Sequence, residues 1–243
     1  MPEGPSIVIA KEEMSVFIGK KVIEAHGNSK IDSERLEGKV LSDIKSWGKH
    51  LLLCFDDFTV RIHFLLFGSY LVNETKSANV RLGLLFKNGH MNFYAASVKV
   101  LEGTADSLYD WSADVMSEQW NPRLAVKKLA DKKEQLICDE LLDQDIFSGV
   151  GNIIKNEVLF RVGVHPNSLV GKIPSKKMKE IVEQAQNYSF DFLRWKKENQ
   201  LKKHWLAHTK KECSKCGQSL VKEYTGKKKR RSFFCTKCQK LYV

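Results

Sequence analysis

Two pairs of cysteines near the end of the chain constrain its fold more than any other feature. Cys213 and Cys216 form one Cys-x2-Cys pair, and Cys235 and Cys238 form a second pair after eighteen intervening residues. This spacing is typical of four-thiolate zinc sites, in which each pair closes a tight turn that directs two sulfurs at one ion. Four thiolates leave no open coordination position, so the sequence predicts one structural zinc ion.

The residues between the two cysteine pairs are strongly basic. Lys227–Arg231 read KKKRR and precede Ser232-Phe233-Phe234, which predicts a β-hairpin with a basic tip that reaches phosphates or enters a groove. The net charge of the chain is +11, and Arg194–Val243 alone holds sixteen Lys and Arg against three acids. The alternative is a solvated tail, but this concentration of charge favours a surface that binds a polyanion.

Residues 1–110 have the composition of a β-rich domain. Short apolar runs flank turn residues at Asp56-Asp57 and at Asn88-Gly89, and Asn-Gly predicts a hairpin whose two turn residues both have positive φ. An early helix is expected over Lys11–Ile18. Strands this short and this numerous indicate a sandwich or a barrel.

The pattern becomes helical after residue 110. Asn121-Pro122 is a helix start, and the helical pattern continues to about Leu142. Further helices are predicted over Asn152–Arg161 and Ser175–Trp195. Gly149 and Gly151 precede the first of these, where backbone N–H groups can bind a phosphate; a tight helix–helix turn is the alternative.

The chain holds no run of about 20 apolar residues, which is the length needed to span a bilayer. Its first residues are acidic where a signal peptide is basic, so we expect no membrane partner and an intracellular protein. In a reducing compartment paired cysteines favour metal over disulfide, and Cys54 and Cys138, in apolar sequence, are expected to be buried and inert.

The first residues also carry a candidate nucleophile. Removal of Met1 is expected because Pro2 is small, and it exposes a secondary amine with a pKa near 8. Such an amine attacks an electrophilic carbon to give an iminium, and Glu3 beside it can transfer a proton. The alternative is that the two prolines of Pro-Glu-Gly-Pro only restrict the backbone of the first residues and have no chemical role.

Three segments together resemble the formamidopyrimidine-DNA glycosylase/endonuclease VIII family. They are Met1–Pro5, the stretch from Leu142-Asp143-Gln144 through Gly149-Val150-Gly151-Asn152 to Arg161, and Arg230–Gln239, in the family's order. The resemblance implies an α+β multi-domain protein. Its expected parts are an N-terminal β-sandwich over 1–115, a helix–two-turn–helix domain over 116–208, and a four-cysteine zinc-finger β-hairpin over 209–243.

The resemblance also implies a bifunctional DNA glycosylase and abasic-site lyase of base excision repair. Pro2 would attack C1′ of a damaged nucleotide flipped out of the duplex, Glu3 would supply a proton, and β,δ-elimination would follow. A monomer acting on double-stranded DNA that contains a damaged base or abasic site is expected, in a bacterial cytoplasm and associated with the nucleoid. The further roles implied for matched positions are catalysis by Lys49, DNA contacts by His63, Asn152, Arg230 and Arg231, support by Glu157, and filling of the vacated base position by Leu65, Leu66 and Phe67.

The chain departs from the family's pattern at two places. Ser6 stands where most members carry a second glutamate, which keeps open a non-catalytic protein that binds damaged DNA on the same scaffold. The stretch Phe190–Cys213 is short and rich in lysine, unlike the long loop of the purine-preferring branch. Together with Leu-Leu-Phe at residues 65–67, this favours oxidised pyrimidines such as thymine glycol. A purine-lesion glycosylase stays the other alternative.

Overall fold

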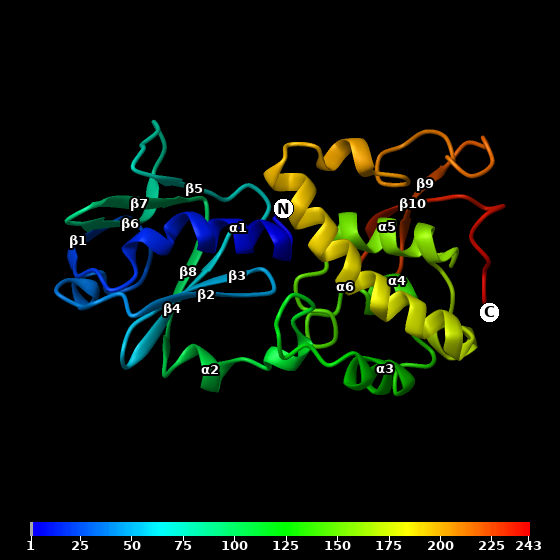
Figure 1. The fold of residues 1–243 in the computed structure, drawn as a ribbon, viewed down its shortest axis with the longest axis horizontal. Helices are drawn as coiled ribbons and strands as arrows, with labels where there is room; N and C mark the ends of the chain where they lie inside the picture. Colours follow the sequence, from blue (N-terminus) through cyan, green and yellow to red (C-terminus); the bar gives the residue numbers. More distant parts are fainter. Residues whose placement is uncertain (1) are drawn as a thin grey trace. The chain divides into compact units, whose positions relative to one another are not determined.

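The computed structural model describes residues 2–243, and the chain divides into two compact units, residues 1–110 and 111–243 (Figure 1). The first unit contains the sheets and the second contains most of the helices. The helical part and the cysteine-rich part lie within one compact unit, so the predicted three-domain division stays a prediction. None of the helices described is both long and apolar enough to cross a membrane.

The first unit is built from two four-stranded antiparallel sheets. The strand orders are β1-β6-β7-β5 and β2-β3-β4-β8. Alternate residues of both sheets enter one apolar core that includes Leu53, Ile62, Leu84 and Phe93, which confirms the predicted β-sandwich. The strands are β1 (Val22–His26), β2 (Asp43–Trp47), β3 (His50–Cys54), β4 (Phe58–His63), β5 (Ser69–Val72), β6 (Val80–Phe86), β7 (Gly89–Tyr94) and β8 (Ser97–Glu102).

Both predicted hairpins of the sandwich are present. Asp56-Asp57 joins β3 to β4, with the Phe55 N–H donating to the Phe58 carbonyl. The β6–β7 turn lies one residue earlier than predicted, because Phe86 pairs with Gly89 and leaves Lys87 and Asn88 at the turn. Of the pair Asn88-Gly89 only Gly89 has a positive φ, 141°.

The first helix begins and ends earlier than predicted. Helix α1 spans Gly4–Met14 in place of Lys11–Ile18, and the short 3-10 helix η1 (Ser15–Phe17) follows it. Pro5 accounts for the early start, since its fixed φ suits the first helical turn. The helix buries Ile7, Ala10 and Met14 in the sandwich core, where it packs against β2 and β3. A four-residue helix, α2 (Ala105–Leu108), ends the unit.

The second unit contains α3 (Pro122–Ala130), α4 (Ile137–Glu140), α5 (Asn152–Val162) and α6 (Ser175–Lys197). Asn121 caps α3 as predicted, because its side chain accepts from the Leu124 N–H. The continuous helix expected up to Leu142 is wrong. Residues 131–134 are exposed turns, since this charged stretch has no apolar side chain to bury.

Helices α5 and α6 agree with the prediction, and Gly163 ends α5 in the left-handed conformation at φ 76°. The two helices pack around one core with Val158, Ile181 and Tyr188. The hairpin of β9 (Val221–Thr225) and β10 (Arg230–Phe234) also forms as predicted, and it packs on α5. Short 3-10 helices complete the chain: η2 (Glu34–Leu36), η3 (Trp111–Ala113), η4 (Val170–Lys172) and η5 (Leu201–His204).

Candidate nucleic-acid interface and zinc centre

The four predicted metal ligands converge on one point. The Sγ atoms of Cys213, Cys216, Cys235 and Cys238 all lie within 4.8 Å of one another. The Cys213–Cys238 sulfurs are 3.8 Å apart and the Cys216–Cys235 sulfurs 3.6 Å apart. A tetrahedral zinc with bonds of about 2.3 Å needs sulfurs about 3.8 Å apart. The cluster therefore fits a structural zinc ion.

The other two cysteines are buried away from this cluster, as predicted. Burial raises the pKa of the Cys54 thiol to about 11 and also raises that of Cys138. Neither thiol is therefore ionised near neutral pH, which is the state expected of an inert cysteine.

The first turn of α5 is bonded to the zinc hairpin through one backbone carbonyl. The Arg231 carbonyl oxygen accepts from Asn152 Nδ2 at 2.9 Å, Asn156 Nδ2 at 3.2 Å and Lys155 Nζ at 3.4 Å. Lys155 is fully buried, and its Nζ also lies 2.8 Å from Ser232 Oγ. These bonds fix the β10 backbone at Arg230 and Arg231 against the start of α5.

A second contact holds the basic tip of the hairpin. The buried Asp139 carboxylate of α4 accepts from the Lys227 N–H at 2.8 Å and the Lys228 N–H at 3.1 Å. Gly226 at φ 68° begins this turn, and a Cβ there would collide with the Asp139 carboxylate. The backbone of the tip is therefore fixed while Lys228 and Lys229 remain exposed. Sequence reasoning found the tip but not its acidic partner.

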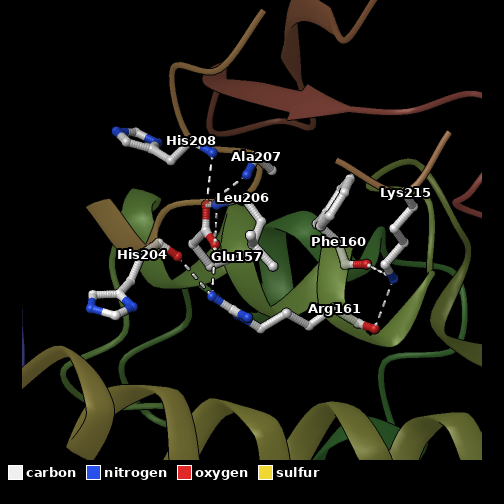
Figure 2. Close-up of polar contacts among 8 residues, drawn as sticks. All are labelled: Glu157, Phe160, Arg161, His204, Leu206, Ala207, His208 and Lys215. Carbon is white, nitrogen blue, oxygen red and sulfur yellow. Dashed lines mark hydrogen bonds and ion pairs between the residues drawn. The ribbon is translucent and has the colours of Figure 1, made fainter. Parts of the chain in front are cut away.

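Glu157 lies at the centre of a third contact (Figure 2). Its fully buried carboxylate accepts from the backbone N–H groups of Leu206 at 3.0 Å, Ala207 at 2.9 Å and His208 at 2.8 Å. Arg161 Nη2 lies 3.3 Å away, one helical turn along. The carboxylate thus fixes the segment between η5 and the first cysteine pair, consistent with the supporting role that the resemblance implies.

Two basic side chains complete the cluster in Figure 2. Arg161 also donates to the His204 carbonyl at 3.0 Å and lies over the Tyr188 ring. Lys215, between the first two cysteines, donates to the carbonyls of Phe160 at 3.1 Å and Arg161 at 3.3 Å. A cation at these last carbonyls is favourable because the C-terminal end of a helix is negative. These bonds join the turn between Cys213 and Cys216 to the end of α5.

His208 belongs to the contact between α5 and the zinc hairpin, and it was not among the site residues predicted from the sequence. Its Nδ1 lies 3.3 Å from Asn156 Nδ2, and its ring packs edge-on against Trp205 and Phe233. Burial, then the charge of Lys155, lowers the pKa of His208 to about 4. The imidazole is therefore neutral at pH 7. No local pattern around residue 208 indicates this, because Asn156 and Phe233 are distant in sequence.

In the first unit, the proposed nucleophile and acid precede α1. Glu3 is 3% exposed and has an extended backbone at φ −108° and ψ 170°, and Pro2 is half-buried. The Ser6 N–H donates to the Glu3 carbonyl at 2.8 Å, so Ser6 lies in the first turn of the helix. The buried position of Glu3 suits a group that exchanges a proton in a desolvated site.

Lys49 lies in the β2–β3 turn, next to a pair of histidines. His50 of β3 and His63 of β4 are directly opposite each other, with ring centroids 5.4 Å apart. Burial, then Arg61, lowers the pKa of His50 to about 3. Burial, then Lys49, lowers the pKa of His63. Both histidines are thus held neutral in a positive field, which suits donation to an anion.

The predicted void-filling residues form an exposed turn between β4 and β5. Leu65 is 47% exposed, Leu66 54% and Phe67 83%, so the alternative of a buried strand does not hold. The turn is closed by the Gly68 N–H donating to the Phe64 carbonyl at 2.7 Å. Such an apolar tip is available to insert between bases.

Two family models match the chain. Residues 1–100 match the formamidopyrimidine-DNA glycosylase N-terminal domain, and residues 112–190 match the formamidopyrimidine-DNA glycosylase H2TH domain. Together they span most of the chain in the order expected from the sequence.

Sequence relatives carry endonuclease 8-like names. The chain is 30% identical over 223 residues to Endonuclease 8-like 3 of Bos taurus, covering 88% of this chain but 37% of that protein. It is 27% identical to Endonuclease 8-like 2 of Bos taurus over 98% of this chain and 96% of that protein. The chain therefore spans little more than a third of the first relative and nearly all of the second.

Solved structures share the fold. A Lactococcus lactis formamidopyrimidine-DNA glycosylase bound noncovalently to DNA containing an AP site superposes with a TM-score of 0.86 at 20% identity, covering 98% of this chain and 99% of that one. A viral DNA glycosylase gives 0.85 at 18% identity, with 98% and 100% covered. With both domain models matched in order, this chain belongs to the formamidopyrimidine-DNA glycosylase/endonuclease VIII family.

Proposed function

We propose that the protein is a bifunctional DNA glycosylase and abasic-site lyase of base excision repair, acting as a monomer on damaged duplex DNA. The observation that carries the proposal is the burial of Glu3, which directly follows Pro2 and precedes α1. The match of residues 1–100 to the family's N-terminal domain supports the same reading of this segment. A bacterial cytoplasm and nucleoid association stay predictions, and the sequence relatives named above come from Bos taurus.

The chemistry begins with the Pro2 amine once Met1 has been removed. The nitrogen lone pair attacks C1′ of the flipped nucleotide, the bond from C1′ to the base breaks, and the base leaves with the bonding electrons and takes up the proton that the amine nitrogen loses. Glu3 protonates the sugar ring oxygen, which opens the ring and gives an iminium. Loss of a C2′ proton expels the 3′ phosphate, a second elimination expels the 5′ phosphate, and water then releases Pro2.

The remaining proposed roles divide between the two units. In the first, Lys49 and His63 contact phosphate at the lesion, and Leu65, Leu66 and Phe67 fill the vacated base position. In the second, the proposed roles are phosphate contact by Asn152, Arg230 and Arg231, support by Glu157, and a structural zinc on the four cysteines. The fixed contacts of β10 on α5 support this assignment, because they hold donors in one place.

We propose oxidised pyrimidines as the substrate class. The short lysine-rich stretch after α6 supports this, since Glu157 holds it tightly and leaves little length for a loop that covers a large purine. Excision of thymine glycol at least about tenfold faster than that of 8-oxoguanine is expected; the reverse order would assign the purine-lesion alternative.

The test of the nucleophile is borohydride trapping on a duplex with one abasic site. We expect a covalent adduct that mass mapping places on Pro2. A matched variant with one glycine inserted between Met1 and Pro2 moves the amine by one residue and should lose the adduct while keeping duplex affinity. Tight binding without an adduct in the wild-type protein would favour the non-catalytic alternative, for which Ser6 is the specific observation.

A further inference from the structure

A row of cationic side chains lies on the outer face of the sheet β2-β3-β4-β8. In the sheet register Arg61 of β4 is directly opposite Lys99 of β8, and His63 is opposite Ser97. Successive side chains of a strand point to opposite faces, and the residues between these enter the core. Those core residues are Val60, Ile62 and Val98.

The register places two like charges, Arg61 and Lys99, directly opposite each other. Side chains directly opposite on neighbouring strands are about 5 Å apart at Cβ, and like charges there destabilise a sheet. Lys45, on the same face, is neutralised by Asp106 at 2.7 Å. Within residues 2–243 no ion pair with a carboxylate is found for Arg61 or Lys99. Arg61 is hydrogen-bonded to the neutral Tyr109 hydroxyl, so its charge, like that of Lys99, is not balanced by a carboxylate.

The positive field of this row reaches the neighbouring histidines. Arg61 lowers the pKa of His50 and of His63, in each case as a contribution smaller than burial. Lys49 contributes in the same direction to both. The row is thus continuous with the Lys49–His63 end of the sheet.

A groove continues the row beyond the edge strand. It has a volume of about 670 Å³, and its lining includes Lys30, Arg81 and Lys99 but no acidic residue. Lys99 is exposed and belongs to both the row and the groove lining. The cations therefore form a path over the sheet and past its edge. An extended polyanion requires such a path, whereas a single small anion would need only one group of cations.

We propose that Arg61 and Lys99 form an additional binding site for the phosphate backbone of nucleic acid, reached from the Lys49–His63 end and continuing into the groove beside β8. This inference rests on the proposed function, because the nucleic acid is the DNA on which the enzyme acts. A phosphate between the two cations turns their mutual repulsion into two favourable contacts. The site positions the DNA and reads no sequence.

The test measures duplex affinity as a function of NaCl concentration for the wild-type protein, Arg61→Gln and Lys99→Gln. Each variant should lower the slope of log K against log salt by about 0.9 and weaken binding about 3- to 10-fold at low salt. Lys87→Gln in the β6–β7 turn is the matched control, since it removes the same charge from the other sheet; its slope should equal the wild-type slope. Arg61→Lys should restore most of the slope.

Thermal stability separates binding from structure. Removing one of two repelling charges should leave the melting temperature of Lys99→Gln unchanged or higher while its affinity falls. A lower melting temperature with an unchanged slope would overturn the site and assign Lys99 a structural role. If Arg61→Gln does not fold, Lys99→Gln alone decides the outcome. Absence of duplex binding by the wild-type protein would instead overturn the proposed function, so the two failures are distinct.

Discussion

The two units of the molecule are stabilised in different ways. Fifteen polar or charged side chains are buried in residues 2–243, and only Glu3, Thr59 and Asn92 of these lie in the first unit. The sandwich is held by apolar packing, whereas the second unit buries twelve polar side chains, of which Asp139, Lys155 and Asn156 bond its helices to its hairpin. Apolar cores tolerate substitutions of similar volume, but a polar network depends on every partner. The second unit is therefore expected to tolerate fewer substitutions of its buried residues than the first unit does.

The largest expected effect comes from removing a zinc ligand in the second unit. Cys235→Ser should release zinc and disorder residues 213–238, with a local loss above about 5 kcal/mol, since metal binding drives the folding of such modules. Metal analysis and amide hydrogen exchange measure both. Cys54→Ala, a cysteine away from the cluster, should keep its zinc. Full zinc content in Cys235→Ser would contradict the four-thiolate site.

A cavity in the sandwich tests the other side of the comparison. Leu84→Ala in β6 removes a fully buried side chain and should destabilise the first unit by about 3 kcal/mol. Hydrogen exchange should accelerate over residues 22–102 and remain as in the wild type over α5 and α6. Leu108→Ala, at a leucine 40% exposed, is the control and should cost less than about 0.5 kcal/mol. Equal acceleration in both units would mean that they unfold together.

Glu157→Gln tests the polar network without changing side-chain volume. The amide would place a donor against backbone N–H groups that now donate to a carboxylate, at a cost of about 3 kcal/mol. Chemical denaturation measures the loss, and exchange should rise first at residues 206–208. Glu183→Gln on the exposed face of α6 is the matched control. A loss below about 0.5 kcal/mol would show that the network is not needed for stability.

The smallest effect is the response to acid, in which the two units should behave alike. His50 and His208 have folded pKa values of about 3 and about 4, both below the ordinary value near 6.5. The unfolded chain therefore binds protons first, and stability present above pH 6.5 is lost as the pH falls toward 4 and then 3. After allowance for partial exposure, each contributes about 1–2 kcal/mol.

Replacing each histidine by Gln should reduce the loss of stability at acidic pH in the unit that contains it, measured by hydrogen exchange between pH 4 and 7. The loss of stability due to His50 should continue to lower pH than that due to His208, because the folded pKa of His50 is lower. An unchanged loss of stability in both variants would assign the acid sensitivity to other groups.

The parts of the fold that were predictable depend on short-range patterns. The Cys-x2-Cys pairs, the Asn121 cap and the basic hairpin each involve residues close in sequence, and the structure has all of them. The helix break after Ala130 was not predictable, because the charged residues 131–134 are compatible with a helical pattern although they offer no apolar face to bury. The early start of α1 follows from Pro5, whose fixed φ suits the first helical turn, whereas the prediction of 11–18 does not include this proline.

The contacts of the candidate site were predictable only as residue types. Glu157 was expected to be a buried support, but its donors at Leu206, Ala207 and His208 lie about fifty residues away, and the bond of Asp139 to the hairpin tip spans 88 residues. Side-chain burial and hydrogen bonding over such separations are set by tertiary packing. The roles of Lys155 and His208 therefore emerged only from the structure.

The Asp139 contact has a consequence for binding rates and heats. A tip whose backbone is already ordered has little conformational entropy left to lose when a polyanion arrives. Association should then be set by electrostatic steering and diffusion, without a slow folding step, and its rate should fall steeply with ionic strength. The heat-capacity change of binding should be correspondingly small, because no disordered segment is brought out of water at this end of the molecule.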